Sequence, residues 1–177
     1  MREDELKATF LLAEDFENTV RKYYLAEGYR FIKANAVARD KGYDFSVASP
    51  KGGGKTLVET KVFRTRVVQR ADILRAVANL EHARRDEGAD RAVFFMTSAI
   101  AIPITDTGGT VVVDVAEFSR MLSQYAELSV ELSSIVRTLT PMPASDFDVN
   151  AYVTFGDAYL AMREGAAPEK KGQSLAL

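Results

Sequence analysis

The sequence predicts a mixed α/β domain in which helices flank a β-sheet, and two observations carry this prediction. The first is a strand, helix, strand order: an alternating segment at Thr56–Phe63 is followed by an amphipathic segment at Gln69–Glu87 and then by the run A-V-F-F-M-T. That run is apolar at consecutive positions, which is typical of a central strand covered on both faces. The second is an amphipathic helix that precedes the strands. Two strands joined through a helix are expected to be parallel, with a right-handed crossover.

Length and composition limit the number of domains and the classes of site. The 177 residues are 47% hydrophobic and 10% aromatic, which suits one well-packed core and leaves too little chain for two substantial domains. There is no cysteine, so disulfides, thiolate metal sites and a cysteine nucleophile are excluded. The N-terminal residues lack the apolar run of a signal peptide, and no stretch approaches the ~18 apolar residues of a membrane span. We therefore expect a cytoplasmic protein that does not contact a membrane.

The N-terminal segment predicts a helix followed by a strand. The helix is expected over Leu6–Leu25, because an apolar stripe at helical spacing is formed there by Leu12, Phe16, Val20 and Tyr23. Glu17 interrupts this pattern at the edge of the face that should be buried. Gly28 is expected to end the helix, and Tyr29–Ala34 is the first predicted strand.

Two alternating segments, Tyr43–Ala48 and Thr56–Phe63, predict a hairpin around the glycine-rich stretch P-K-G-G-G-K. Because side chains alternate between the faces of a strand, Glu59 and Lys61 point to the same side. In the first strand, Asp44 shares its face with small side chains that would let a substrate backbone approach closely. Pairing of the two strands is expected to bring Asp44 next to Glu59.

The ionisable residues of this hairpin favour metal-assisted hydrolysis of a phosphodiester bond. Two converging carboxylates, Asp44 and Glu59, with a nearby backbone carbonyl are the hard oxygen ligands that Mg²⁺ or Mn²⁺ prefers. Lys61 beside them can orient an attacking water or neutralise charge on a phosphate. Spacing alone does not select this interpretation, because charged residues on one strand face usually form an exposed ion pair. Leu57 and Phe63 flank the pair on its own face, which favours a cleft floor over open solvent.

Basic residues gather around and after the second strand, although the net charge of the chain is -2. Between positions 51 and 75 two residues are acidic and seven are basic, namely Lys51, Lys55, Lys61, Arg64, Arg66, Arg70 and Arg75. Local patches, rather than total charge, supply affinity for phosphates. The alternative is a solvated loop and helix face, which is what charge runs usually are.

The second half of the chain predicts a further strand and a series of helices. Val111–Val113 is a buried strand, and Asp114 is the expected N-cap of a helix over Val115–Tyr125. Another amphipathic helix follows, with an apolar line formed by Leu128, Leu132, Ile135 and Leu139. A last helix is predicted at Tyr152–Met162, and the polar residues 164–177 are expected to be disordered.

The order and spacing of these segments resemble the core of the PD-(D/E)xK nuclease superfamily, and in particular its Mrr-type restriction endonuclease branch. The likeness runs from about Asp15 to Tyr125 and is carried by F-E-N-T-V-R-K-Y-Y-L-A-E-G-Y, G-Y-D-F, V-E-T-K-V-F-R, E-G-A-D-R-A, A-V-F-F-M-T-S and V-V-V-D-V-A-E-F. Two features depart from the family. Only Ala99–Thr110 separates the T-S strand from the V-V-D strand, where a longer helical segment is usual, and no segment corresponds to the separate DNA-recognition domain. The resemblance implies a restriction-endonuclease-like mixed β-sheet flanked by helices, with a C-terminal helical extension.

The resemblance also implies the parts of a Mg²⁺ or Mn²⁺ site. Asp44 and Glu59 are expected to hold the metal with the Thr60 carbonyl, and Lys61 to position or activate water. A glutamate on the first helix reaches toward the metal in the family, and Glu17 matches it; the alternative is an exposed carboxylate at the helix edge. Nucleic-acid phosphates are expected to contact Lys55, Arg64, Arg66, Gln69 and Arg70.

The implied function is that of a metal-dependent DNA endonuclease in restriction or anti-phage defence, acting alone or as the nuclease subunit of a larger system. The alternatives are a non-catalytic nucleic-acid or protein-binding module on the same fold, a DNA repair or junction-resolving nuclease, and an RNase. We expect a nuclease-like domain at 1–125, a helical extension at 126–163 and the tail at 164–177. Because cutting both strands usually needs two active sites, the extension is expected to contact a second copy or a targeting partner, unless it packs on its own core.

Overall fold

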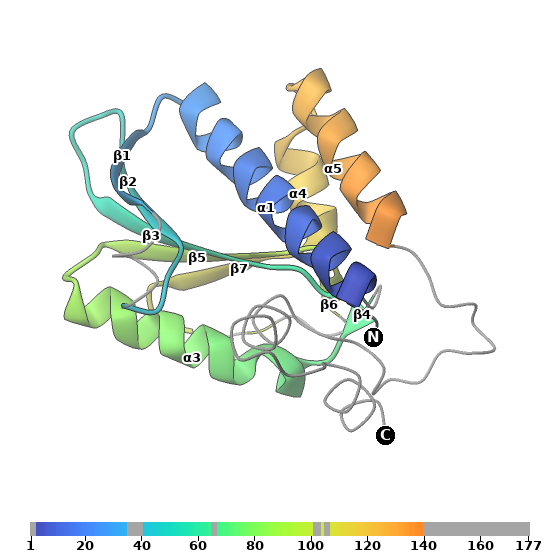
Figure 1. Cartoon of the computed structure of the whole chain (residues 1–177). Coiled ribbons are helices and arrows are strands. Elements are labelled where there is room, and N and C mark those ends of the chain that lie inside the picture. Colours follow the sequence, from blue (N-terminus) through green and yellow to red (C-terminus); the bar gives the residue numbers. More distant parts are fainter. Residues whose placement is uncertain (1–2, 35–40, 65–66, 101–103, 105–106, 140–177) are drawn as a thin grey trace.

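The computed structural model describes residues 3–34, 41–64, 67–100, 104 and 107–139 (Figure 1). The elements in chain order are α1 (Glu3–Ala26), β1 (Arg30–Ala34), β2 (Phe45–Ala48), β3 (Lys55–Lys61), β4 (Val67–Val68), α3 (Arg70–Asp86), β5 (Arg91–Met96), β6 (Ala99–Ile100), β7 (Thr110–Val113), α4 (Val115–Met121) and α5 (Ala126–Leu139). None of these helices has the length and apolar character needed to cross a membrane. The predicted helix at 152–162 and the tail at 164–177 lie outside the described residues.

The main sheet has five strands in the order β1-β2-β3-β5-β7. β2 pairs antiparallel with both β1 and β3, whereas β3, β5 and β7 run parallel to one another. Helix α3 makes the connection between β3 and β5, so the strand, helix, strand unit is parallel as predicted. The mixed α/β architecture expected from the sequence is therefore confirmed, with the hairpin on one half of the sheet and the crossover on the other.

A second, two-stranded sheet was not predicted from the sequence. β4 pairs parallel with β6, with Val67 opposite Ala99 and Val68 opposite Ile100. In the segment after Phe63 the sequence pattern shows only clustered basic residues. Two-residue strands are too short to show an alternating pattern, and only the partner segment more than thirty residues away reveals them.

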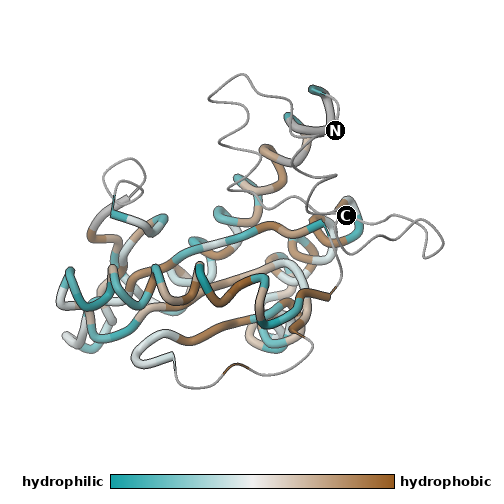
Figure 2. The backbone as a smooth tube through the Cα atoms, turned by 90° about the horizontal axis from the view of Figure 1, so that it is seen from below, coloured by the Kyte–Doolittle hydropathy of each residue, from teal (hydrophilic) through white to brown (hydrophobic). Residues whose placement is uncertain are grey.

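Each face of the main sheet has its own apolar core. α1, α4 and α5 cover one face and α3 covers the other (Figure 1). Alternation along the strands divides the side chains between them: Val58 and Phe95 pack toward α1, while Leu57 and Phe94 pack toward α3. In Figure 2 the hydrophobic segments follow the strands at the centre of the molecule. The site residues on β3 therefore lie on a rigid strand buried between two helical layers.

Helix α4 ends four residues earlier than predicted. Its N-cap is as expected, because the Asp114 carboxylate accepts a backbone N–H of the first turn at 2.9 Å. At the other end, the N–H of Tyr125 closes a turn on the carbonyl of Leu122 at 2.8 Å. The Tyr125 ring lies edge-on to that of Tyr23, with centroids 6.3 Å apart. Tyr125, which lies between α4 and α5, thus contacts α1 with its side chain.

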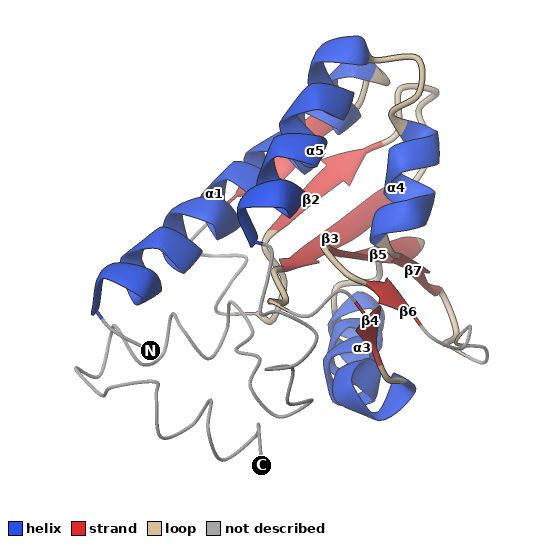
Figure 3. Ribbon diagram, turned by 90° about the vertical axis from the view of Figure 1, so that its right-hand side faces the viewer, coloured by secondary structure: helices blue, strands red, loops and turns tan. Residues whose placement is uncertain are grey.

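Helix α5 packs along α1, and the two lie side by side in Figure 3. Its predicted apolar line is buried, with exposed fractions of 8%, 2% and 5% for Leu128, Leu132 and Ile135. Polar contacts close the edge of the same interface: Glu131 accepts a hydrogen bond from Thr19 Oγ1 at 3.0 Å and pairs with Lys22 at 2.7 Å. The line that had suggested an assembly surface is thus covered by the core of its own chain.

The carboxylate of Glu81 joins α3 to the start of β7. It accepts hydrogen bonds from Arg84 Nε and Nη2 at 2.7 Å each, and from Arg85 Nε at 2.9 Å. The Gly109 N–H and Thr110 Oγ1 donate to it at 3.1 Å and 2.9 Å. These donors, led by Arg84, outweigh the effect of burial and lower the pKa of Glu81 from its ordinary 4.5 to about 2.

This contact is expected to make folding stability sensitive to acid. Because the pKa of Glu81 is depressed in the folded state, its charged form contributes stability above pH 4.5, and the contribution is lost as the pH falls toward about 2. Urea unfolding of wild type and Glu81→Gln should show the largest difference in free energy of unfolding near neutral pH and a shrinking difference in acid. Glu14→Gln, at an exposed position of α1, should follow wild type throughout. If the difference in free energy of unfolding between wild type and Glu81→Gln does not change with pH, the lowered pKa of Glu81 is contradicted.

Candidate active site

The end of β3 and the start of β2 bring the predicted hairpin residues together. Phe45 lies opposite Val58 in the antiparallel register, and the Asp44 N–H donates to the Val58 carbonyl at 2.9 Å. This pair is the last of the register, and Asp44 and Glu59 are the residues next to it on the two strands. The hairpin expected from the sequence is therefore present, and both carboxylates belong to residues that adjoin its last pair.

Two hydrogen bonds from Thr60 hold the carboxylate of Asp44. The Thr60 N–H donates to Asp44 Oδ2 at 2.7 Å, and Thr60 Oγ1 donates to the same oxygen at 2.9 Å. Asp44 is only 4% exposed, and a buried carboxylate is stable only when it receives such bonds. In an extended strand the N–H and C=O of one residue point to the same side. The Thr60 carbonyl is thus directed toward the side of β3 on which Asp44 lies.

Glu59 and Lys61 form a partly exposed pair on the α3 side of β3. Their nearest charged atoms, Glu59 Oε1 and Lys61 Nζ, are 3.9 Å apart. The side chains are 17% and 23% exposed, so they are accessible from solvent but not surrounded by it. Leu57 and Phe63, on the same face, are almost fully buried in the core beneath α3. The apolar flanks predicted from the sequence are therefore present on both sides of the pair.

Thr97 fixes the chain where it leaves β3, a role that the sequence did not indicate. Its Oγ1 accepts from the Phe63 N–H at 2.9 Å and lies 3.2 Å from the Phe63 carbonyl, to which it donates. The Thr97 N–H donates to the Lys61 carbonyl at 3.3 Å. Thr97 is 5% exposed and directly follows β5. The only available signal was a threonine at the end of a buried apolar run, which is too common to identify a contact.

Glu17 is buried on α1 and contacts Arg21. It is 8% exposed, and its Oε2 lies 3.2 Å from Arg21 Nε. The Arg21 guanidinium in turn stacks over the ring of Phe45, 4.8 Å from its centroid. The alternative of an exposed helix-edge carboxylate is therefore wrong, because this side chain is shielded between α1 and the first strands.

The oxygen donors at the end of β3 fit a magnesium or manganese ion. Within the described ranges, no three histidine, cysteine, aspartate or glutamate side chains gather closely enough to hold a metal, so Glu17 does not complete a three-carboxylate cluster. Mg²⁺ is usually held by one or two carboxylates, with waters in the remaining positions. Asp44, Glu59 and the Thr60 carbonyl make a donor set of this kind. A role for Glu17 toward the metal stays a prediction.

The predicted phosphate-contacting residues divide into two places. Arg64, Gln69 and Arg70 follow the end of β3 and lead into α3, with Arg70 and Gln69 exposed and Arg64 half-buried. Lys55 begins β3, about 20 Å along the strand from Lys61 at ~3.3 Å per residue. Its ammonium pairs with Glu87 at 2.7 Å, and Arg66 lies outside the described residues. Only Arg64, Gln69 and Arg70 follow the end of β3 that carries Glu59 and Lys61.

Comparison with known proteins gives one family and one solved structure. The model of the family Mrr_cat, described as restriction endonuclease, matches residues 11–107, which is more than half of the 177-residue chain and includes every candidate site residue. The structure of Pyrococcus furiosus SfsA in complex with Ca²⁺ is similar at 18% sequence identity with a TM-score of 0.33. That match covers 69% of this chain and 53% of SfsA, about half the length of that protein. No curated protein matches the chain.

Proposed function

From the premise that the chain belongs to the Mrr_cat restriction endonuclease family, we propose that it is a Mg²⁺- or Mn²⁺-dependent DNA endonuclease. One observation carries the proposal for this chain in particular: Thr60, the residue between Glu59 and Lys61, donates two hydrogen bonds to Asp44. Asp44, Glu59 and Lys61 are therefore not three separate charges on a surface. The Asp44 carboxylate is fixed against the backbone of β3, the strand that carries Glu59 and Lys61, which supports a preorganised site.

Each ionisable side chain has its own role in the proposed reaction. Asp44 and Glu59 would hold the cation with the Thr60 carbonyl, and a bound cation would polarise the phosphate and favour deprotonation of water. The Lys61 ammonium donates a hydrogen bond to the attacking water or to a phosphate oxygen, where it stabilises developing negative charge. As the water oxygen bonds to phosphorus, the water gives up a proton to solvent, the bond to the leaving ester oxygen breaks, and that oxygen takes up a proton from solvent.

The first experiment uses the wild-type chain with supercoiled plasmid and with a structured RNA, each with Mg²⁺, with Mn²⁺ and with a chelator. We expect nicked and linear DNA with either metal and intact DNA with the chelator. Cleavage that survives the chelator would contradict the metal requirement. RNA cleavage with intact DNA would favour the RNase alternative, and DNA binding without any cleavage would favour the non-catalytic module. Substrates with branched junctions, cut in preference to plasmid, would favour a repair or junction-resolving nuclease.

The basic residues beside the site are expected to bind DNA phosphates. Replacing Arg64 and Arg70 together with alanine should weaken binding without a change of fold, because one is exposed and the other half-buried. The slope of log affinity against log salt should fall by about one unit per lost phosphate contact. The matched control is the double change Arg120→Ala with Arg137→Ala, which removes the same charge from exposed positions of α4 and α5. Equal slopes in both double variants would mean that the first pair faces away from DNA.

We further propose that the protein acts in restriction or anti-phage defence together with a second copy or a targeting partner. Two active sites would cut both strands of a duplex, and a partner would supply target selection. The apolar line of α5 is not the surface for such a contact, since α1 covers it.

A further inference from the structure

A cavity of about 640 Å³ lies along β7, the edge strand of the main sheet, and neither Glu59 nor Lys61 lines it. Val93 and Val113, from the core on the α1 side, are on its floor, and Val112, which packs against the core beneath α3, also lines it. A volume of this size is within the ~300–1,000 Å³ range of small-molecule sites. The cavity is therefore separate from the candidate active site, and what it suits can be argued independently of the nuclease proposal.

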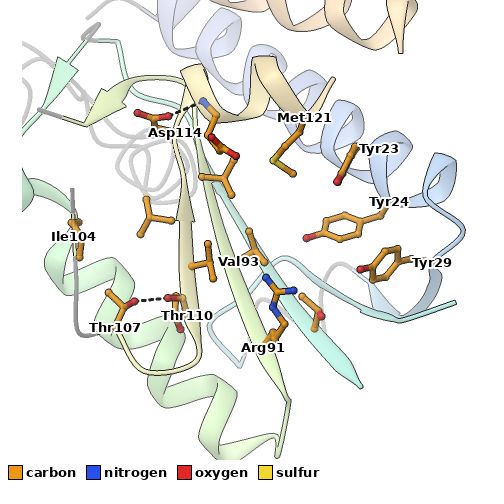
Figure 4. Close-up of a pocket in the computed structure, with 15 residues that line it drawn as sticks. Tyr23, Tyr24, Tyr29, Arg91, Val93, Ile104, Thr107, Thr110, Asp114 and Met121 are labelled. Carbon is orange, nitrogen blue, oxygen red and sulfur yellow. Dashed lines mark hydrogen bonds between the residues drawn. The ribbon is translucent and has the colours of Figure 1, made fainter. Parts of the chain in front are cut away.

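Aromatic side chains form one wall of this cavity. Tyr23, Tyr24 and Tyr29 approach from α1 and the turn after it, and Met121 of α4 lies beside them (Figure 4). The rings of Tyr24 and Tyr29 meet edge-on with centroids 5.0 Å apart. Together with the valine floor, such a wall suits a planar or otherwise apolar body.

Arg91 supplies positive charge at one end of the cavity. It is the only lysine or arginine among the described lining residues. It is exposed, and no carboxylate in the described part of the chain lies within ion-pair distance of its guanidinium. Arg84, by contrast, is paired with Glu81. An unpaired guanidinium at the mouth of an aromatic cavity is suited to an anionic group.

The Tyr24 hydroxyl adds a second donor at the same end. Tyr24 is 5% exposed, and among the described residues its hydroxyl has no hydrogen-bond partner. Figure 4 shows the hydroxyls of Tyr24 and Tyr29 directed into the cavity toward Arg91. Burial raises the pKa of Tyr24 far above its usual value, so the hydroxyl keeps its proton. A protonated hydroxyl that faces the cavity can donate a hydrogen bond to an acceptor on a ligand.

The opposite end of the cavity is acidic and already satisfied. The Asp114 carboxylate accepts the N–H groups of Ile100 and Glu117, and Glu117 pairs with Arg120. These carboxylates would repel an anion and direct it to the arginine end. They also argue against a nucleic-acid strand, because a polyanion needs a row of cations and this cavity has one.

We propose that this cavity binds a small organic anion, with its phosphate or carboxylate on Arg91 and the Tyr24 hydroxyl and its planar, apolar body against Val93 and the tyrosine wall. The anionic group of the ligand matches the Arg91 end of the cavity, and its apolar body matches the tyrosine wall beside that end. Neither part requires the metal, the DNA or the residues of the candidate active site.

Calorimetric titration of the full chain with phenyl phosphate, benzoate and inorganic phosphate tests the proposal. Phenyl phosphate or benzoate should bind at one site, and more tightly than inorganic phosphate, which lacks the apolar body. Arg91→Gln should weaken that binding by about tenfold or more, and Tyr24→Phe, which keeps the ring, by about two- to tenfold. Arg30→Gln is the matched control, because Arg30 also begins a strand and is exposed but does not line the cavity.

Three results would overturn the proposal. The first is no binding of either aromatic anion by the wild type, and the second is equal affinity in wild type, Arg91→Gln and Tyr24→Phe. The third is that Arg91→Gln weakens binding of a single-stranded oligonucleotide while phenyl phosphate is unaffected, which would assign the arginine to nucleic acid. Urea unfolding of the variants confirms that each is folded before its affinity is compared.

Discussion

Replacing Lys61 with alanine is expected to reduce DNA cleavage by about 10²–10⁴-fold, the range found when a proton-transferring or charge-stabilising group is removed from an active site. The side chain is partly exposed and belongs to neither apolar core, so the fold should be retained. A matched control is Lys7→Ala: Lys7 ends another Glu-x-Lys triplet, Glu5-Leu6-Lys7, but lies on a helix rather than on β3. Initial rates on plasmid DNA at saturating metal measure the effect.

Asp44→Asn separates charge from structure at the same site. An asparagine oxygen can still accept the two hydrogen bonds that Thr60 donates, so the hairpin should keep its geometry. The lost negative charge should weaken metal binding, so cleavage should fall and should need more Mg²⁺ to recover. Wild-type rates in either Lys61→Ala or Asp44→Asn would place the chemistry elsewhere. Loss of cleavage in Lys7→Ala as well would point to a general effect on the protein.

Replacing Leu132 with alanine is expected to lower the free energy of unfolding by about 2–5 kcal/mol, the usual cost of deleting a buried leucine side chain. Leu132 is 2% exposed in the core that α5 shares with α1, α4 and the sheet. Val130→Ala, on the same helix but 64% exposed, should change stability by no more than about 0.5 kcal/mol. Urea denaturation followed by circular dichroism measures both.

A chain ending at Gln124 extends the same argument. Without α5, the apolar residues of α1 that now pack on it would face water, so this shorter chain should unfold or aggregate. A shortened chain that is monomeric, as stable as wild type and unaffected in cleavage would show that α5 is dispensable to the fold. Equal stability of Leu132→Ala and Val130→Ala would lead to the same conclusion.

Sequence periodicity predicted the helices and strands that carry the site, because the pattern of apolar residues along each element depends on that element alone. The 3.6-residue pattern located α1, α3 and α5, and the two-residue alternation placed Glu59 and Lys61 on one face of β3. Asp114 was identifiable as an N-cap because its side chain bonds within its own turn. The chemical roles were inferred from the resemblance to the nuclease family, because spacing alone favoured an exposed ion pair between Glu59 and Lys61.

Contacts between distant segments could not be read in this way. The Thr97 bonds to Phe63 join residues 34 apart, and the Lys55 pair with Glu87 joins residues 32 apart. The cavity beside Tyr24 depends on Arg91, which belongs to a different element. Helix α4 also ends at Met121 rather than at the predicted Tyr125, whose ring contacts Tyr23 of α1. Such features are set by tertiary packing, which local sequence patterns do not report.

The parallel pairing of β3 with β5 also determines when the site can form as the chain leaves the ribosome. Asp44, Glu59 and Lys61 emerge early, but β3 gains its second neighbour only when Arg91–Met96 has followed, and the Thr97 contact comes later still. Parallel strands joined by a crossover are among the slower pairings to form. The helix that covers α1 is made last among the described elements. A partly synthesised chain therefore carries the ionisable residues without the framework that positions them.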